Sequence, residues 1–276
     1  MIINGKLLAE KIKHEIRLDA EKLPIRPGFG VLLVGAHPAS RLYVELKCKA
    51  AAELGFYFEK IHLPSQAPLP KILRALKRLN ASKKIHGIIV QIPLPRSISQ
   101  DAISNAIARE KDIDCFHPNN VSALFLGKPF IVPPTAEADL VAIRSVDPRL
   151  AGKHAVIVGS GFFGRQTAAH LVNAGATVTM AHSRTRDLPA LTRQADILVS
   201  AVGKPGCITK DMVKKDAIVI DVGITKKGSR ILGDVAFDEV APRVRAITPV
   251  PGGIGPLTVA LLMKNVLKAA RESLTK

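Results

Sequence analysis

The chain of 276 residues has no tryptophan, and only 4% of its residues are aromatic. Proteins that hold single-stranded nucleic acid stack its bases on aromatic side chains, so this class of protein is disfavoured. The three cysteines, Cys48, Cys115 and Cys207, are isolated and form no CxxC pair. Their spacing predicts neither a disulfide framework nor a zinc site, and we expect no bound metal.

Long hydrophobic runs are also missing. No uncharged apolar stretch approaches the ~20 residues that a helix needs to cross a bilayer. Charges at Lys6, Glu10, Lys11 and Lys13 interrupt the start of the chain, which therefore lacks the apolar core of a secretory signal. The sequence predicts a protein of the cytoplasm without a membrane partner.

Positive charge is in excess. There are 40 lysines and arginines against 23 aspartates and glutamates, and the formal net charge is +17. Such a charge indicates an anionic partner, either nucleic acid, a membrane surface or a small phosphorylated or carboxylated molecule. The basic residues are dispersed, and their densest cluster, residues 71–84, has the spacing of a solvated helix face. We therefore expect a small anionic ligand and no nucleic acid.

Short apolar runs alternate with segments of helical period along most of the chain. This alternation is typical of an α/β protein with parallel sheets flanked by helices. The predicted strands are residues 29–34, 88–90, 155–158, 177–181, 196–201 and 217–222, and the predicted helices lie near 40–54, 68–80, 163–174 and 208–214.

Prolines between residues 133 and 148 indicate a domain boundary. We expect an α/β domain over residues 1–140 and a second domain, with a Rossmann-type parallel sheet, over residues 141–256. A last helix, about 257–276, is expected to pack back on the first domain.

A predicted strand runs into Gly159-Ser160-Gly161-Phe-Phe-Gly164, and a predicted helix follows. In this context GxGxxG indicates a turn that lets the backbone approach a pyrophosphate at the amino end of the helix. After the next predicted strand, Ser183 and Arg184 stand where an NAD site carries a carboxylate. Both can donate to a 2′-phosphate, so we predict an NADP site without excluding NAD.

Segment 40–54 has the pattern of an amphipathic helix, with Ser40 as its amino cap and Gly55 as its carboxyl stop. Tyr43 and Lys47, four residues apart, share one face. A lysine beside a tyrosine can have a lowered pKa and take part in proton transfer. The buried stripe is expected to consist of three apolar residues, Leu42, Leu46 and Ala50.

Polar residues also follow the predicted strand 88–90. Gln91 stands at its carboxyl end, which is where open α/β sheets bind ligands. Asp112 and Asp114 form an i, i+2 pair of carboxylates. One of them is expected to cap local backbone and the other to be available to a ligand.

Together these segments resemble the bifunctional methylenetetrahydrofolate dehydrogenase/methenyltetrahydrofolate cyclohydrolase family. The matching pieces keep the family's order from about residue 3 to 270, and they are 34–47, 91–95, 112–114, 182–185, 201–206, 220–224 and 247–256. The resemblance implies a folate-binding amino-terminal domain, an NADP-binding Rossmann domain, a cleft between them and a homodimer. It also implies NADP-dependent oxidation of 5,10-methylenetetrahydrofolate and hydrolysis of the product to 10-formyltetrahydrofolate, as part of one-carbon metabolism and purine biosynthesis.

The resemblance also implies roles for individual residues. Lys47 matches the catalytic lysine of hydrolysis, Gln91 tunes it by hydrogen bonding, and Tyr43 and Asp114 contact the folate. A loop near the folate consists of Pro251, Gly252 and Gly253. The implied cofactor contacts are Thr135, Gly159, Ser160, Gly161, Gly164, Ser183, Arg184, Ile224 and Thr248.

Three positions depart from the family pattern. The glycine turn lacks the arginine of the usual Gly-Arg-Ser, so NADP preference rests on Ser183, Arg184 and a further arginine, Arg165 or Arg186. Residues 133–138 read PPTAEA, where the family has Pro-Cys-Thr-Pro-x-Gly. Cys115 replaces the glycine that usually follows the aspartate, which restricts the backbone around Asp114.

Three alternatives remain open at this stage. One is a family member with dehydrogenase activity only. Another is a shikimate-type two-domain NADP dehydrogenase, which would oxidise a ring alcohol and ignore folates. The third is a non-catalytic module that uses the +17 charge to bind nucleic acid, and its binding to duplex DNA would weaken steeply with salt.

Overall fold

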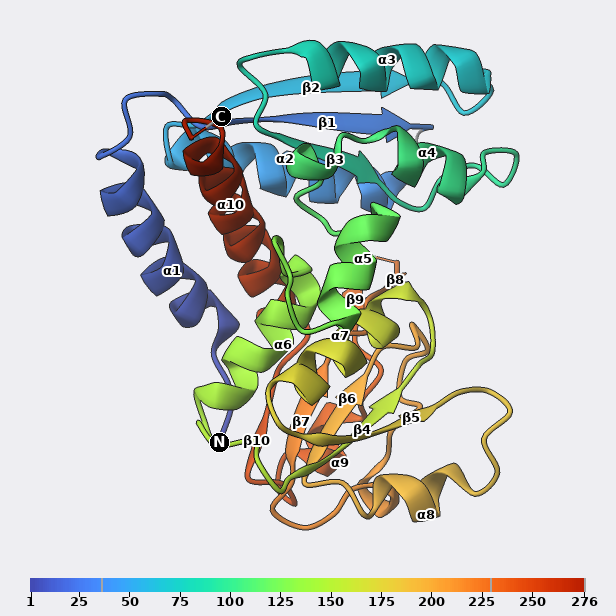
Figure 1. The fold of residues 1–276 in the computed structure, drawn as a ribbon. Coiled ribbons are helices and arrows are strands. Elements are labelled where there is room, and N and C mark those ends of the chain that lie inside the picture. The colour runs from blue at the N-terminus through green and yellow to red at the C-terminus, as the bar shows by residue number, and fades with distance from the viewer. Residues whose placement is uncertain (36, 229, 276) are drawn as a thin grey trace. The chain divides into compact units, whose positions relative to one another are not determined.

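Figure 1 shows the computed structural model, which describes residues 1–35, 37–228 and 230–275. The chain divides into two compact units, and each is α/β. Unit 1 comprises Met1–Ala9 and Pro134–Thr258, and unit 2 comprises Glu10–Pro133 and Val259–Lys276. This division precedes α6 (Pro134–Arg144), whereas the boundary expected from the sequence falls inside that helix.

The sheet of unit 2 has three parallel strands in the order β2-β1-β3. β1 (Gly28–Val34) lies between β2 (Tyr57–Leu63) and β3 (Gly87–Gln91), and all seven residues of β1 are buried. Helix α3 (Leu69–Ala81) covers one face, and α2 (Pro38–Glu53) and α10 (Ile254–Glu272) cover the other (Figure 1). Burial on both faces explains the continuous apolar runs in β1 and β3.

Each face of this sheet has its own core. Leu32 and Val34 pack with Leu76 and other residues of α3. Phe29 and Val31, whose side chains alternate with those, pack with α2 and with the part of α10 that follows Val259. The remaining helices that reach into or lie within this unit are α1 (Gly5–Ala20), α4 (Gln100–Ala106) and α5 (Pro118–Phe125), with a 3₁₀ turn at Arg109–Lys111.

The sheet of unit 1 has five parallel strands in the order β10-β7-β6-β4-β5. They are β4 (His154–Val158), β5 (Thr177–Ala181), β6 (Ile197–Ser200), β7 (Ile218–Asp221) and β10 (Ala246–Ile247). From β4 the chain builds first to one side, with β5, and then to the other, with β6. This reversal of strand order is the topological switch point of a Rossmann sheet, at whose carboxyl edge ligands bind.

Helices and a hairpin complete unit 1. Helices α6 and α7 (Phe162–Asn173) pack against each other and against the sheet. Ile3 N–H donates to Ile247 O at 2.8 Å, so the first residues of the chain extend the sheet beside β10. The other elements are α8 (Leu188–Thr192), α9 (Phe237–Val240) and the hairpin of β8 (Thr225–Lys227) and β9 (Arg230–Leu232).

The predicted strands are all present, with ends within two residues of those expected. The helix expected near 208–214 is wrong, because only a 3₁₀ turn, Lys210–Met212, forms there. Ile208 instead pairs with Val235, donating its N–H to Asp234 O at 3.1 Å and accepting from Ala236 N–H at 2.8 Å. Strand β2 was not predicted from the sequence.

Two expectations about α2 are also wrong. The helix begins at Pro38, so Ser40 lies inside its first turn and does not cap it. Leu42 and Leu46 are 41% and 44% exposed, although Ala50 is buried as expected. The buried face carries two polar side chains, which a search for apolar spacing passes over, and it consists of Ser40, Val44, Lys47 and Ala51.

None of the helices in the described part of the chain combines the length and hydrophobicity needed to span a bilayer.

Two side-chain contacts join α6 to α7. His170 Nε2 lies 2.6 Å from Glu137 Oε2, and Thr167 Oγ1 donates to Asp139 Oδ2 at 2.7 Å. Asp139 is fully buried, and its Oδ1 has no hydrogen-bond partner in the described structure. Burial raises the pKa of Asp139 to about 8, from an ordinary value of 3.8, and the Thr167 hydrogen bond offsets only part of that shift.

Asp139 makes stability depend on pH. Between pH 4 and pH 8 the folded protein keeps a proton that the unfolded chain has lost, so the free energy of unfolding falls as pH rises through this interval. We expect Asp139→Asn to remove this part of the slope and to unfold at a higher temperature than wild type at pH 8. Thermal unfolding of both proteins from pH 5 to pH 9 measures the difference. The exposed Asp211→Asn is the control, and equal slopes for Asp139→Asn and wild type would contradict the assignment.

Candidate functional site

Lys47 and Gln91 meet in unit 2. Lys47 lies on α2 and is 8% exposed, and Gln91 is the last residue of β3. Lys47 Nζ donates to Gln91 Oε1 at 3.0 Å, and Gln91 Nε2 donates to Ile92 O at 2.8 Å. The second bond fixes the orientation of the amide, so that its oxygen faces the amine. The structure thus brings together two residues that the sequence singled out separately.

Burial decides the electrostatics around this amine. It lowers the pKa of Lys47, and the nearby charge of Asp114 offsets only part of that change. Burial also raises the pKa of Asp114, again with a smaller opposing effect from Lys47. Tyr43, one turn before Lys47, is half-buried and has a raised pKa for the same reason. A lysine with a lowered pKa has a larger neutral fraction at neutral pH and can accept a proton.

The structure assigns the two carboxylates at 112 and 114 to different tasks. Asp112 is fully buried and accepts from the N–H groups of Phe116 (2.9 Å) and His117 (2.8 Å) and from Asn120 Nδ2 (2.8 Å). Asp114 is half-buried, and no described residue donates a hydrogen bond to its carboxylate. Asp112 therefore holds the turn, and Asp114 stays available to a ligand.

Cys115, which lies between Asp114 and helix α5, has φ of 60°. That left-handed conformation costs an L-residue roughly 1–2 kcal/mol, which accounts for the glycine in the family pattern. The buried thiol also has a raised pKa, mainly through desolvation, so it is a poor nucleophile.

Asn265 is a positioning residue that the sequence analysis missed. From α10, its Nδ2 donates to Ile113 O at 2.9 Å and to Val132 O at 2.8 Å. It thereby fixes the backbone between Asp112 and Asp114. In the sequence, the feature that could have indicated this role is a single asparagine among the apolar residues of the last helix.

In unit 1, the glycine turn occupies the switch point between β4 and β6. A Cβ on Gly159, where φ is +120°, would lie 2.5 Å from Ala201 O, and a Cβ on Gly164 would lie 2.0 Å from Gly159 O. Only glycine fits either position. Gly161 is the N-cap of α7 and provides no side-chain cap, and Ser160 accepts from Arg165 Nε at 2.9 Å. A backbone cradle at an uncapped helix end is suited to a pyrophosphate.

The turn after β5 is formed by His182 and Thr185, which flank the predicted site residues Ser183 and Arg184. His182 N–H donates to Thr185 Oγ1 at 2.9 Å, and Arg184 N–H lies 3.1 Å from His182 Nδ1. Ser183 and Arg184 are exposed, and their side chains make no hydrogen bond within the described chain. Free donors of these two kinds can bind a 2′-phosphate, and the contact itself stays a prediction.

The other predicted site residues also belong to unit 1. Ile224, after β7, is 41% exposed, and Thr135 is half-buried in the first turn of α6. Thr248 is fully buried, with its Oγ1 accepting from Asp221 N–H at 2.8 Å. The loop Pro251, Gly252 and Gly253 precedes α10 and also lies in unit 1, whereas Lys47, Gln91 and Asp114 lie in unit 2.

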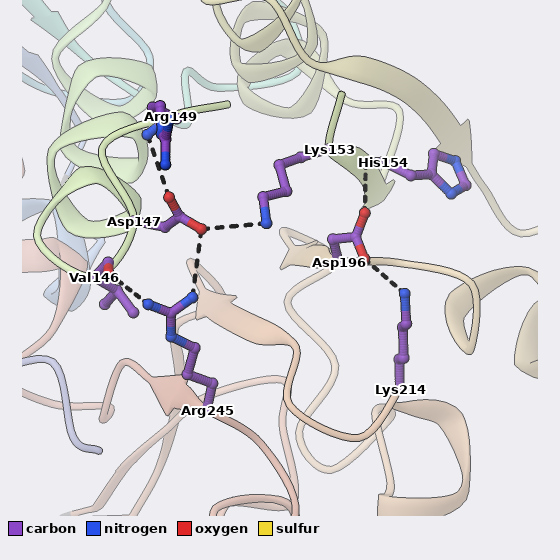
Figure 2. A network of polar contacts seen from close by, with 8 residues as sticks. All are labelled: Val146, Asp147, Arg149, Lys153, His154, Asp196, Lys214 and Arg245. Carbon is purple, nitrogen blue, oxygen red and sulfur yellow. Dashed lines mark hydrogen bonds and ion pairs between the residues drawn. The ribbon is translucent and has the colours of Figure 1, made fainter. Parts of the chain in front are cut away.

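A cavity of about 230 Å³ lies at the opposite, amino edge of the unit 1 sheet. Figure 2 shows its ion pairs: Asp147 binds Lys153 and Arg245, and Asp196 binds Lys214 at 2.6 Å. These two carboxylates pair with three of the five basic side chains that line the cavity. It is therefore a structural ion-pair network, placed where α/β sheets do not bind their ligands. Among the described residues, no cluster of histidine, cysteine or carboxylate side chains is arranged to hold a metal ion.

These features define a class of protein. Unit 1 is a Rossmann-type dinucleotide-binding unit, and unit 2 is an α/β unit with a buried lysine at the end of a parallel strand. Residues 133–274 match the family model of the tetrahydrofolate dehydrogenase/cyclohydrolase NAD(P)-binding domain, and residues 3–114 match that of the catalytic domain. The chain belongs to the tetrahydrofolate dehydrogenase/cyclohydrolase family.

Individual relatives agree with this assignment over nearly the full length. The bifunctional protein FolD of Bartonella bacilliformis is 48% identical over 289 residues, covering 99% of this chain and 97% of that protein. The FolD structure from Campylobacter jejuni is 41% identical, with a TM-score of 0.95 and 99% of each chain covered. The Trypanosoma brucei FolD structure, complexed with NADP cofactor and an inhibitor, is 38% identical, with a TM-score of 0.96 and coverage of 100% and 99%.

Proposed function

We propose that the protein oxidises 5,10-methylenetetrahydrofolate to 5,10-methenyltetrahydrofolate with NADP and hydrolyses that product to 10-formyltetrahydrofolate. The observation that carries the proposal is the buried Lys47–Gln91 pair, found in a chain of this family that also has the glycine cradle. The first reaction needs a dinucleotide site and the second needs a base near the folate. Both requirements have candidate residues in the described structure.

In the hydrolytic step Lys47 acts as the general base. Water adds to the carbon between N5 and N10 of the methenyl cation, and its proton passes to the neutral amine of Lys47. The bond from that carbon to N5 then breaks and N5 takes its electron pair. The remaining hydroxyl proton of the adduct passes to N5 as the carbonyl forms, and the formyl group stays on N10. Burial lowers the pKa of Lys47, which enlarges the fraction of neutral amine that can accept the proton. Gln91 holds the amine in place, and Tyr43 and Asp114 position the folate.

In the oxidative step NADP supplies the hydride acceptor. The methylene carbon loses a hydride, and N5 and N10 stabilise the resulting cation, so this chain's residues need only bind and orient. The cradle of Gly159, Gly161 and Gly164 holds the pyrophosphate, while Ser183 and Arg184 hold the 2′-phosphate. We assign the remaining contacts from the family pattern, with Ser160, Thr135, Ile224 and Thr248 at the cofactor and Pro251, Gly252 and Gly253 at the folate.

The protein acts as a homodimer in the cytoplasm, with a folate-binding domain and an NADP-binding domain. Its net charge of +17 suits two anionic ligands, because NADP carries phosphates and folate carries carboxylates.

The test of the whole proposal is an absorbance assay of purified protein with methylenetetrahydrofolate and either NADP or NAD. We expect methenyltetrahydrofolate to appear and then to be hydrolysed, with NADP preferred. No turnover with either nucleotide would contradict the proposal.

Lys47→Met tests the base. The substitution keeps the length of a buried side chain and removes the amine, so we expect hydrolysis of methenyltetrahydrofolate to fall by about 10²–10⁴-fold, the range of general-base effects. Oxidation of methylenetetrahydrofolate persists, because that step needs no base. Decay of the methenyl absorbance measures the first rate, and NADPH formation measures the second. The control is Lys49→Met, an exposed lysine on the same helix. Wild-type hydrolysis by Lys47→Met would rule out this role.

Arg184→Ala tests the cofactor preference. A hydrogen bond between charged groups contributes about 1.5–3 kcal/mol, so we expect KM for NADP to rise by about tenfold or more. KM for NAD, which has no 2′-phosphate, stays unchanged. Initial rates with each nucleotide measure both constants. Arg149→Ala is the matched control, an exposed arginine at the amino edge of the same sheet (Figure 2). A parallel rise in both constants would place Arg184 away from the 2′-phosphate.

A further inference from the structure

Two buried carboxylates in unit 1 have no part in the chemistry proposed so far. Asp221 is the last residue of β7 and is 4% exposed, and Asp234 follows β9 and is fully buried. Both lie at the carboxyl edge of the parallel sheet, which is the edge of the glycine cradle. Burying a carboxylate costs free energy, so each of these groups requires hydrogen-bond donors that replace its lost hydration.

Asp234 holds the segment that follows β6. Its carboxylate accepts from Ser200 Oγ at 2.9 Å, from Val202 N–H at 2.7 Å and from Lys204 N–H at 2.8 Å. Ser200 is the last residue of β6, and the other two donors belong to the loop that leaves it. One side chain therefore fixes the course of this loop over its first four residues.

Asp221 holds the segments that follow β7 and β9. Its carboxylate accepts from the N–H groups of Gly223 (3.0 Å), Asp234 (3.0 Å) and Val235 (2.9 Å). Burial raises the pKa of Asp221 to about 6, so the group is ionised at neutral pH and can accept all three bonds. Since one of its donors is the backbone of Asp234, the two carboxylates form one connected network.

Two glycines allow the carboxylates to approach the backbone this closely. A Cβ on Gly223 would lie 2.1 Å from the Asp234 carboxyl group, and a Cβ on Gly233 would lie 2.0 Å from Asp221 Oδ2. Asp234 thus occupies the space of a missing side chain on the segment after β7, and Asp221 occupies that of a missing side chain directly before Asp234. The loops after β6 and β7 are locked to each other as well as to the sheet.

The locked segments carry two exposed aliphatic side chains. Val202 is 46% exposed and Ile224 is 41% exposed, each within three residues of the end of its strand. The strands β6 and β7 are neighbours, with Ser200 paired in register with Asp221. Exposed apolar side chains on a rigid, hydrogen-bonded base offer a surface for a flat ring, while the phosphates of the same ligand lie at the glycine cradle.

We infer that Asp221 and Asp234 are positioning residues that fix Val202 and Ile224 as an apolar support for the nicotinamide ring of NADP. The inference rests on the proposed function and extends it to residues that touch neither substrate nor phosphate. Hydride transfer depends steeply on the placement of the ring, whereas the phosphates and the adenosine supply most of the affinity. Loosening the network should therefore lower kcat more than it weakens binding.

The first test compares wild type with Asp234→Asn. Asparagine keeps the shape of the side chain but turns an NH₂ group toward N–H donors that need an acceptor. We expect kcat for hydride transfer to fall by about tenfold or more, while Kd for NADP changes by about threefold or less. Deuterium on the methylene carbon should slow the variant more than wild type, because transfer becomes rate-limiting. Cyclohydrolase activity, which uses no nucleotide, should be retained and shows that the chain is folded. The control is Asp238→Asn, an exposed carboxylate on α9.

Val202→Ala tests the apolar support without touching the network. It removes two methyl groups from an exposed side chain, so folding is preserved, and it should reproduce the fall in kcat and the larger isotope effect. If Asp234→Asn loses both activities through unfolding, Val202→Ala decides. Wild-type kcat and isotope effect in Val202→Ala, or in a folded Asp234→Asn, would overturn the inference and leave the proposed function intact. Wild-type protein without dehydrogenase activity would overturn the proposed function itself.

Discussion

The hydrogen bond between Lys47 and Gln91 is the interaction on which the proposed chemistry depends. An amine removed from water loses the hydration that favours its charge, and its pKa falls unless a neighbouring anion restores that charge. The partner here is a neutral amide at 3.0 Å, which holds the amine without adding a negative charge. A carboxylate at position 91 would keep the lysine protonated and unable to accept a proton. Asp114 supplies a weaker opposing field, since burial disfavours its own charge.

Both units use the same structural device. Gln91 ends β3, Ser200 ends β6 and Asp221 ends β7, and each is a buried polar residue at the last position of a parallel strand. At that position the side chain is still covered by the flanking helices or loops, while the backbone that follows has left the ladder and needs new partners. A polar side chain there can hold the departing loop or a functional group. Ligands bind at this edge because the sheet ends in polar groups that are already rigid.

The sequence predicted the parts of the fold that depend on apolar runs and on glycine. The buried strands and the glycine turn lie where the sequence pattern predicted them. A strand that is covered on both faces is a continuous apolar run, so it is readily recognised in the sequence. It could not choose between Asp112 and Asp114, since the choice depends on Asn120 and on backbone donors that only the folded turn brings together. It also missed Asp234, whose partners lie as far as 34 residues away in the chain.

The wrong prediction for the buried face of α2 and the proposed role of Lys47 have the same physical origin, which is the burial of a polar side chain. The sequence analysis placed only apolar side chains on the buried face, so its stripe ran through Leu42 and Leu46, which are exposed. If Ser40 and Lys47 are allowed to be buried, positions 40, 44, 47 and 51 follow the helical period, and the correct face emerges. Burial of Lys47 is the property that lowers its pKa and suits it to act as a base. A hydrophobic pattern is therefore least reliable at the residues that carry function, because those residues are polar where the pattern expects them to be apolar.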